Sequence, residues 1–88
     1  MNRKKQLKSL FSQLCMELEL NNFNENADYN KKSLILDFNS VYGGYRIETI
    51  KGDGSTGEGF YIFCSRFQLG EMISFIQGNI HGLQTRKK

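Results

Sequence analysis

The sequence predicts a small α+β protein with the element order αβββα: a helix, three antiparallel strands and a second helix. Three observations carry this prediction. Apolar residues recur every three or four positions near both ends of the chain, they alternate in between, and glycine and asparagine clusters separate the segments. With 88 residues the chain can build one modest hydrophobic core. We therefore expect residues 1–88 to form a single small domain with basic N- and C-terminal ends.

The first helix is predicted over residues 4–20. Its apolar positions share the spacing of one helical face, and they are Leu7, Leu10, Phe11, Leu14 and Leu18. Residues 21–32 contain five asparagines, whose side chains bond to nearby backbone groups and favour turns. We expect a loop there, with Phe23 and Tyr29 anchoring it to the core.

Alternation predicts the first strand over residues 33–39, with Leu34, Leu36 and Phe38 on its helix-facing side. A tight turn at residues 39–40 leads to a second strand over residues 42–50, where Gly43 and Gly44 indicate a bulge or a close backbone approach. A glycine-rich loop then precedes a third strand over residues 60–64. Because the connections are short, we expect a three-stranded antiparallel meander.

The second helix is predicted to begin with a capping box formed by Ser65 and Gln68, and Gly82 is predicted to end it. Its apolar positions again share one face, and they are Leu69, Met72, Ile73, Ile76, Ile80 and Leu83. We expect the two helices to pack on one face of the sheet, which leaves the other face open to solvent or to a partner.

Charge is distributed unevenly along the chain, whose formal net charge is +3. Seven of the twelve lysine and arginine residues lie at the two ends without an acid among them, whereas residues 9–85 contain all nine acids. Such ends either contact phosphates or serve as solubilising tails, and the sequence leaves both readings open. The candidate electrostatic contacts are Arg3, Lys4, Lys5, Lys8, Arg86, Lys87 and Lys88.

No catalytic or metal-binding set is recognisable, so we expect a protein that is not an enzyme and has no cofactor or metal. His81 is the only histidine, and together with Cys15 and Cys64 it offers at most three strong zinc ligands without close spacing. Residues 52–57 match the dinucleotide-binding pattern G-x-G-x-x-G, but a strand rather than a helix is predicted to follow them. We interpret this segment as a flexible hairpin loop.

The low cysteine content favours a reduced, cytoplasmic setting, although a disulfide between Cys15 and Cys64 stays open. No apolar run approaches the ~20 residues that span a bilayer, so we expect no membrane association.

The open sheet face is the candidate binding surface. If Leu34, Leu36 and Phe38 face the helices, one alternation of the other strands places Arg46, Glu48, Tyr61 and Phe63 on the opposite face. Aromatic rings beside an arginine can stack on nucleic-acid bases or form a hot spot for a protein partner. The alternative is that these rings complete the core, and a register shift of one residue exchanges Tyr61 for Ile62.

Two resemblances bear on function. The αβββα order is that of double-stranded-RNA-binding domains, but the lysine cluster of that family is missing at the start of the second helix, where residues 65–71 hold one arginine and one acid. The string Tyr42-Gly43-Gly44-Tyr45-Arg46, followed by a glycine-rich hairpin and by Leu69-Gly70-Glu71-Met72, resembles small uncharacterised proteins encoded by phages and mobile elements. This resemblance implies no enzymatic activity and favours an accessory protein that binds a larger host machine. Anti-CRISPR proteins are similar in size and in their lack of catalytic residues.

The expected function is therefore a non-enzymatic binding module that occupies a larger host protein or nucleoprotein, with an anti-CRISPR or other anti-defence inhibitor as its sharpest version. The alternative is direct binding of RNA or single-stranded DNA through the basic ends and the strand aromatics. A homodimer formed through the open sheet faces is a third possibility.

Overall fold

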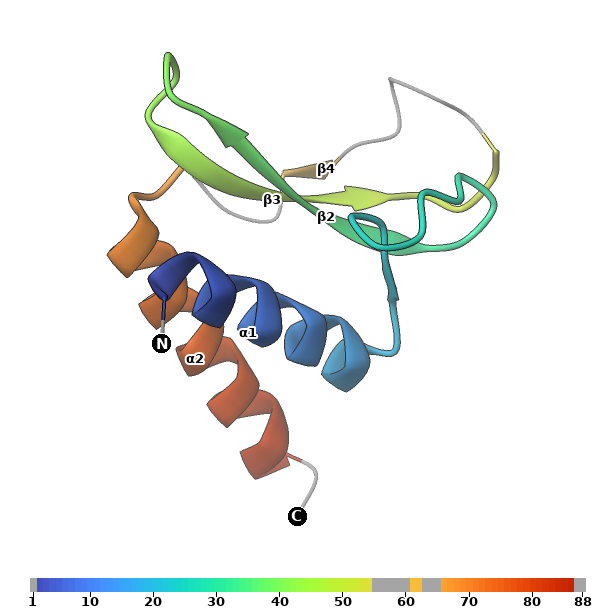
Figure 1. Cartoon of the computed structure of the whole chain (residues 1–88). Helices are drawn as coiled ribbons and strands as arrows, with labels where there is room; N and C mark the ends of the chain where they lie inside the picture. Colours follow the sequence, from blue (N-terminus) through green and yellow to red (C-terminus); the bar gives the residue numbers. More distant parts are fainter. Residues whose placement is uncertain (1, 55–60, 63–65, 87–88) are drawn as a thin grey trace.

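The protein folds as two helices beneath one sheet. The computed structural model describes residues 2–54, 61–62 and 66–86. Along the chain these form α1 (Arg3–Leu18), β1 (Asn21–Asn22), β2 (Ser33–Asn39), β3 (Gly44–Ile50), β4 (Tyr61–Ile62) and α2 (Leu69–Arg86). Both helices lie on the same side of the sheet (Figure 1). The predicted α+β class is confirmed.

The sheet has four strands in the order β1-β2-β3-β4. The pairs β2–β3 and β3–β4 are antiparallel, but β1 pairs with β2 in parallel, with Asn21 opposite Ser33. The prediction of a three-stranded, purely antiparallel sheet is therefore wrong at this edge. Asparagine favours turns locally, yet α1 ends beside the edge of β2, where the backbone of Asn21 donates to Lys32 O at 3.0 Å and that of Phe23 to Leu34 O at 3.0 Å. Tertiary placement overrides local propensity here.

Helix α1 begins and ends through local capping. The side chain of Asn2 accepts a hydrogen bond from Lys4 N at 2.8 Å, so Asn2 is the N-cap. Glu19 ends the helix in the left-handed conformation, with φ 59°, and Leu20 N donates to Cys15 O at 2.9 Å. The predicted end at residue 20 lies two residues beyond the observed end at Leu18. The apolar Leu20 continues the spacing of the helical stripe, although the chain has already left the helix at that point.

Helix α2 starts and stops later than predicted. Glu71 Oε1 accepts from Gln68 N at 2.9 Å, so the capping interaction forms between these residues, while Ser65 lies outside the described residues. The helix continues past Gly82 to Arg86, so Gly82 does not end it. An interior glycine costs a helix only about 1 kcal/mol relative to alanine, which the packing of the preceding turns offsets.

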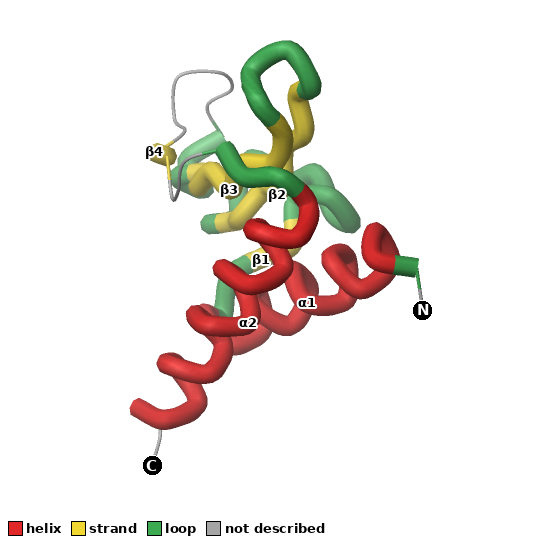
Figure 2. Tube along the Cα trace, turned by 90° about the vertical axis from the view of Figure 1, so that its left-hand side faces the viewer, coloured by secondary structure: helices red, strands yellow, loops and turns green. Residues whose placement is uncertain are grey.

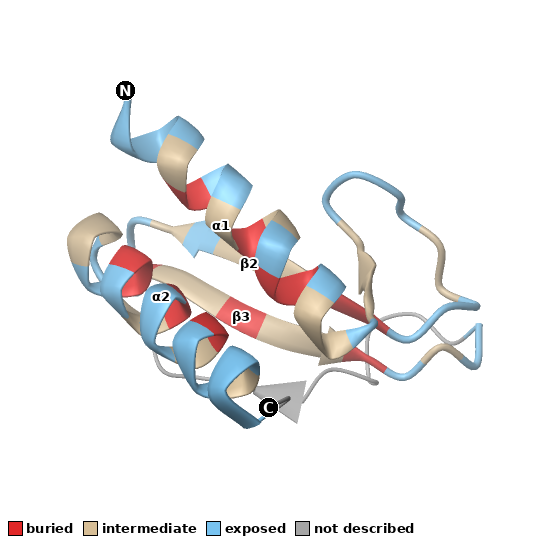
Figure 3. Ribbon diagram, turned by 90° about the horizontal axis from the view of Figure 1, so that it is seen from below, coloured by how far each residue is buried: buried red, intermediate tan, exposed pale blue. Residues whose placement is uncertain are grey.

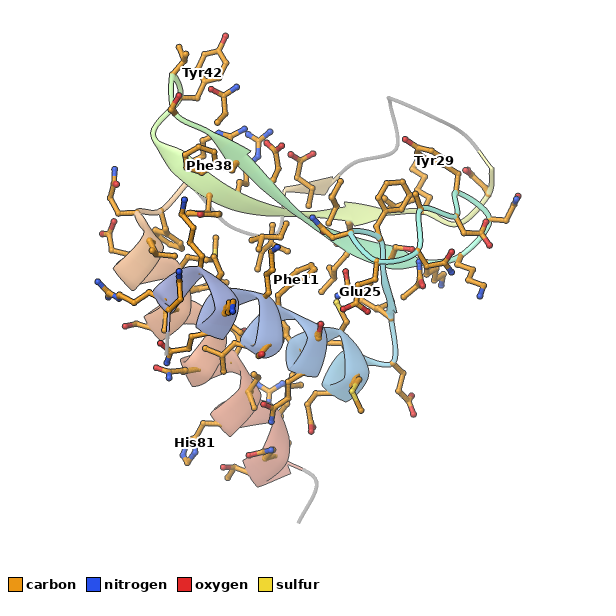
Figure 4. The ribbon with its side chains drawn as sticks, in the orientation of Figure 1. Phe11, Glu25, Tyr29, Phe38, Tyr42 and His81 are labelled. Carbon is orange, nitrogen blue, oxygen red and sulfur yellow. The ribbon has the colours of Figure 1, made fainter. Side chains whose placement is uncertain are left out.

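The core lies between the two helices and the near face of the sheet. The buried positions of the helices face each other and the strands in the view from below (Figure 3), and Phe11 points from α1 towards the sheet (Figure 4). The buried hydrophobic residues are Leu7, Phe11, Leu14, Cys15, Leu34, Ile47, Ile50, Met72, Ile73, Ile76 and Ile80. Most of these positions belong to the apolar stripes read from the sequence.

The β2–β3 hairpin extends beyond the helices (Figure 2). Leu34 and Leu36 pack against the core as predicted, but Phe38, on the same face, is 58% exposed because no helix lies beneath it. The turn is held by Asn39 Oδ1, which accepts from Val41 N at 2.9 Å and from Tyr42 N at 3.3 Å. The close approach predicted at the glycine pair occurs at Gly44, which has φ 118° and lies against the backbone of Phe67.

Candidate binding surfaces

The open face of the sheet carries a cluster of charged side chains around the β2–β3 hairpin. The register places Asp37 opposite Arg46, and Glu48 lies two residues further along β3 on the same face. Arg66 reaches this face from the segment before α2. We call Asp37, Asn39, Tyr42, Arg46, Glu48 and Arg66 the open-face cluster.

Both arginines of the cluster are held by hydrogen bonds. Arg46 donates from Nε and Nη2 to Glu48 Oε1 at 3.1 and 2.9 Å. Arg66 donates from Nη2 to Asp37 Oδ2 at 2.7 Å and from Nη1 to the carbonyl oxygen of Gly44 at 2.8 Å. Because each arginine faces one acid, the cluster has no net charge, and its guanidinium planes are fixed in orientation.

A shallow hollow of about 500 Å³ opens between Asn39, Tyr42, Arg46 and Arg66. Tyr42 is 73% exposed and Val41 beside it 84% exposed, and Tyr42 lies at the tip of the hairpin, away from the helices (Figure 4). Tyrosine and arginine are the residue types enriched in the energetic centres of protein interfaces. The hollow therefore combines a rigid polar base with an exposed aromatic rim.

Of the four residues predicted for the open face, the structure brings two together. Arg46 and Glu48 lie together and form an ion pair. The backbone register of β4 pairs Ile62 with Glu48 and Tyr61 with Thr49, and Phe63 lies outside the described residues.

Four members of the open-face cluster are not among the residues predicted for this face: Asp37, Asn39, Tyr42 and Arg66. Tyr42 falls within the strand predicted over residues 42–50, but β3 begins only at Gly44, and the glycine pair that follows Tyr42 belongs to the turn and its end. Arg66 falls at the predicted start of the second helix, whereas α2 begins at Leu69 and Arg66 lies in the segment before it.

The described basic residues of the two ends lie on different helices. Arg3, Lys4, Lys5 and Lys8 are exposed on the first half of α1, and Arg86 is exposed at the end of α2. The start of α1 and the end of α2 lie apart in Figures 1 and 2. Lys87 and Lys88 lie outside the described residues.

A second hollow, the α1–β2 groove, lies on the helix side of the sheet and has a volume of about 440 Å³. It combines apolar side chains with two lysines, an acid and several amides or hydroxyls. The lining residues are Lys4, Leu7, Lys8, Phe11, Ser12, Asn22, Asn24, Glu25, Leu36 and Tyr45. This groove has the size and mixed chemistry typical of binding sites.

The residues considered for metal or nucleotide binding are dispersed. His81 is exposed on α2 and points away from the body (Figure 4), and no three potential metal-ligating side chains gather within the part of the chain that the structure describes. Gly52 and Gly54 have positive φ angles, and Gly54 N donates to Tyr29 O at 2.8 Å. Residues 55–57 of the glycine pattern lie outside the described residues.

Cys15 is a buried free thiol. Burial, reinforced by the negative charge of Glu25, raises the pKa of Cys15 to about 12. Such a thiol is protonated at neutral pH and is a poor nucleophile. Cys64 lies outside the described residues.

The chain matches no known protein-family model, no curated protein and no solved structure. Within residues 2–54, 61–62 and 66–86, neither helix has the combination of length and apolar character that crossing a bilayer requires.

Proposed function

We propose that this protein is a non-enzymatic binding module that occupies the surface of a larger protein or nucleoprotein through its hairpin tip and open-face cluster. The observation that carries the proposal is the position of exposed Tyr42 and Val41 beside two arginines that internal hydrogen bonds already hold. A partner that covers the hairpin tip would bury these side chains and meet donors fixed in advance.

The arginines favour binding because little conformational freedom is left to lose. The side chain of Arg66 is 12% exposed and that of Arg46 29% exposed, so neither is a freely moving surface arginine. Ordering a mobile side chain at an interface costs about 0.5–1.5 kcal/mol. The internal ion pairs have already met most of this cost.

In its most specific form, the proposal is that the protein is an inhibitor of the anti-CRISPR type. Such an inhibitor is encoded by a phage or mobile element and acts on a host defence complex. The support for this form of the proposal is the resemblance around residues 42–46 together with the exposure of Tyr42 and Gly43, the first two residues of that segment, at the hairpin tip. A protein of this size can inhibit by occluding a functional surface, which requires binding but no chemistry.

The experiment compares a double variant, Val41→Ser with Tyr42→Ser, against Met16→Ser. Met16 is the matched control because it is 76% exposed and apolar but lies on α1, away from the hairpin. We expect the hairpin variant to lose about tenfold or more in affinity for a partner captured with the wild-type chain, since a hot-spot residue contributes more than about 1.4 kcal/mol. The control should bind as the wild type does. Unchanged affinity of the hairpin variant for every captured partner contradicts the proposal.

The alternative is direct binding of RNA or single-stranded DNA. One observation favours it: Lys4 and Lys8 line the same groove as Tyr45, so cations and an aromatic ring share one surface. Fluorescence polarisation measures whether the chain binds labelled single-stranded DNA, single-stranded RNA or duplex RNA, at low and at physiological salt. Binding that weakens steeply with salt and with loss of both lysines supports the alternative.

A second copy of the chain is the remaining partner to test. Light scattering at two protein concentrations detects it, because a homodimer raises the measured mass as concentration increases. A dimer abolished by the hairpin variant would identify the hairpin tip as a self-association surface.

A further inference from the structure

We propose that the α1–β2 groove binds an extended peptide segment of a partner protein, with an acidic side chain of the segment between Lys4 and Lys8. The groove lies on the helix side of the sheet, so this site is separate from the open-face cluster. Its chemistry differs as well, because the cluster balances its charges internally.

The first support is unbalanced positive charge over an apolar floor. Lys4 and Lys8 are one helical turn apart and both line the groove. Among the described residues, neither lysine has an ion-pair partner. The floor between them and the sheet is formed by the apolar side chains Leu7, Phe11 and Leu36 and the ring of Tyr45.

The opposite end of the groove is polar and already saturated. Asn22 Nδ2 donates to Ser12 Oγ at 3.1 Å, and Ser12 Oγ donates to Glu25 Oε1 at 3.1 Å. The carboxylate of Glu25 would repel a ligand that is negative along its whole length. The groove therefore suits an occupant with an acid at its lysine end and no negative charge at the other, which favours a peptide over a nucleic-acid strand.

The second support is the free edge of β2. Strand β1 covers this edge only as far as Leu34. At Leu36 the side chain of Asn24 takes the place of a strand, since Asn24 Oδ1 accepts from Leu36 N at 2.8 Å and Asn24 Nδ2 donates to Leu36 O at 3.0 Å. Beyond that point, within the described residues, no strand pairs with this edge.

Phe38 is the residue exposed at this edge. Its cross-strand neighbour Tyr45 uses both backbone groups on Phe67, at 2.8 and 2.7 Å, so the backbone N–H and C=O of Phe38 face outward. The centroids of the Phe38 and Tyr45 rings lie 4.7 Å apart. The Phe38 ring therefore continues the apolar floor of the groove to the edge. An extended segment can thus form backbone hydrogen bonds with Phe38 and place alternate side chains on the floor, as in strand addition.

The experiment selects binders from a phage-displayed library of random nonapeptides, with the full-length chain as bait. We expect enriched peptides to combine an aspartate or glutamate with apolar residues at alternate positions. An enriched peptide is then labelled, and its Kd is measured by fluorescence polarisation. Lys4→Glu combined with Lys8→Glu should weaken binding about tenfold or more. Lys5→Glu combined with Lys31→Glu makes the same charge change at exposed positions outside the groove and should leave the Kd within about twofold.

Two further measurements make the outcome decisive. N-methylation of single backbone amides of the peptide should weaken binding at one or two positions, because the segment pairs with Phe38 through its backbone. The Lys4/Lys8 variant should remain folded by circular dichroism, since acidic side chains near a helix N-terminus are favourable.

The proposal is overturned if no peptide is enriched, if the enriched peptides lack acids, or if the Lys4/Lys8 variant binds as tightly as its control. Displacement of the peptide by oligo(dT) at physiological salt would assign the groove to nucleic acid and overturn it too. If the Val41/Tyr42 variant rather than the Lys4/Lys8 variant loses the peptide, the segment binds the open-face cluster. The groove inference then fails while the proposed function stands.

Discussion

The guanidinium of Arg66 reaches Asp37 from the far side of β3, with Nη2 2.7 Å from Oδ2. The same guanidinium donates to the carbonyl oxygen of Gly44. One side chain therefore joins β2, β3 and the segment that leads into α2, and it fixes the position of the hairpin relative to the second helix.

Removal of this connection should destabilise the fold. We expect Arg66→Ala to lower the free energy of unfolding by about 2 kcal/mol, since hydrogen bonds that involve a charged group contribute about 1.5–3 kcal/mol and Asp37 is partly solvated. Arg66→Lys should recover only part of the loss, because an ammonium group cannot reproduce the two-pronged geometry. Urea denaturation of the three proteins measures the difference. A lysine variant as stable as the wild type would show that charge alone matters.

The glycine pair of the hairpin offers a matched comparison. Both residues have positive φ angles, but a Cβ at Gly43 has open space around it, whereas a Cβ at Gly44 would collide with the carbonyl oxygen of Phe67. We expect Gly43→Ala to cost about 1–2 kcal/mol from backbone strain alone. Gly44→Ala should cost at least about 1 kcal/mol more, because it also disturbs the backbone pairing of Phe67 with Tyr45. Equal losses in thermal or urea unfolding would contradict the close approach at Gly44.

The C-terminus of α1 should be open to stabilisation. Glu19 occupies a left-handed conformation at φ 59°, in which glycine has no Cβ to crowd the backbone. Glu19→Gly should raise the free energy of unfolding by about 1 kcal/mol. The control is Gln13→Gly, at an exposed position inside the same helix, which should lower it by about 1 kcal/mol. Opposite signs in the two variants are the expected result, and a loss at both positions would argue against the left-handed cap.

The sequence was most informative where one face of an element packs against the core. The bounds of β2 agree with the prediction because Leu34 and Leu36, which pack against the core, alternate with Ile35 and Asp37 on the other face of the strand. Alternation could not predict β1, because this strand has only two residues and therefore no pattern of its own. Its pairing depends on where α1 delivers the chain, and no local window contains that information.

The candidate surfaces were harder to predict than the elements. Arg46 and Glu48 were found because strand alternation alone places them on one face. The exposure of Phe38 depends on how far the helices extend beneath the sheet, and the role of Arg66 depends on a contact with Asp37. The groove is less visible still in sequence, because it is built from α1, β1, the following turn and both central strands.

The thiol of Cys15 provides a test of the core through pH. Burial raises the pKa of Cys15 to about 12, with a further contribution from Glu25, whereas an unfolded cysteine ionises near its ordinary value of about 8.5. As pH rises above that value, the unfolded chain loses the proton first and is stabilised relative to the folded chain. Cys15 therefore lowers stability progressively through the alkaline range, up to the folded-state pKa, and has no such effect at neutral pH.

The measurement uses a Cys64→Ser background, so that one thiol titrates, and compares it with the same chain carrying Cys15→Ala. Between pH 8 and pH 9.5 the stability advantage of the Cys15 protein over the alanine protein should shrink by about 1 kcal/mol, because each unit of differential pKa is worth about 1.4 kcal/mol. All other ionisable groups are the same in the two proteins, so their contributions cancel in the difference. Alkylation by iodoacetamide at pH 8 should likewise be slow until denaturant is added. A pH-independent difference in stability between the two proteins, or rapid alkylation of the folded chain, would show that Cys15 is not buried in the core.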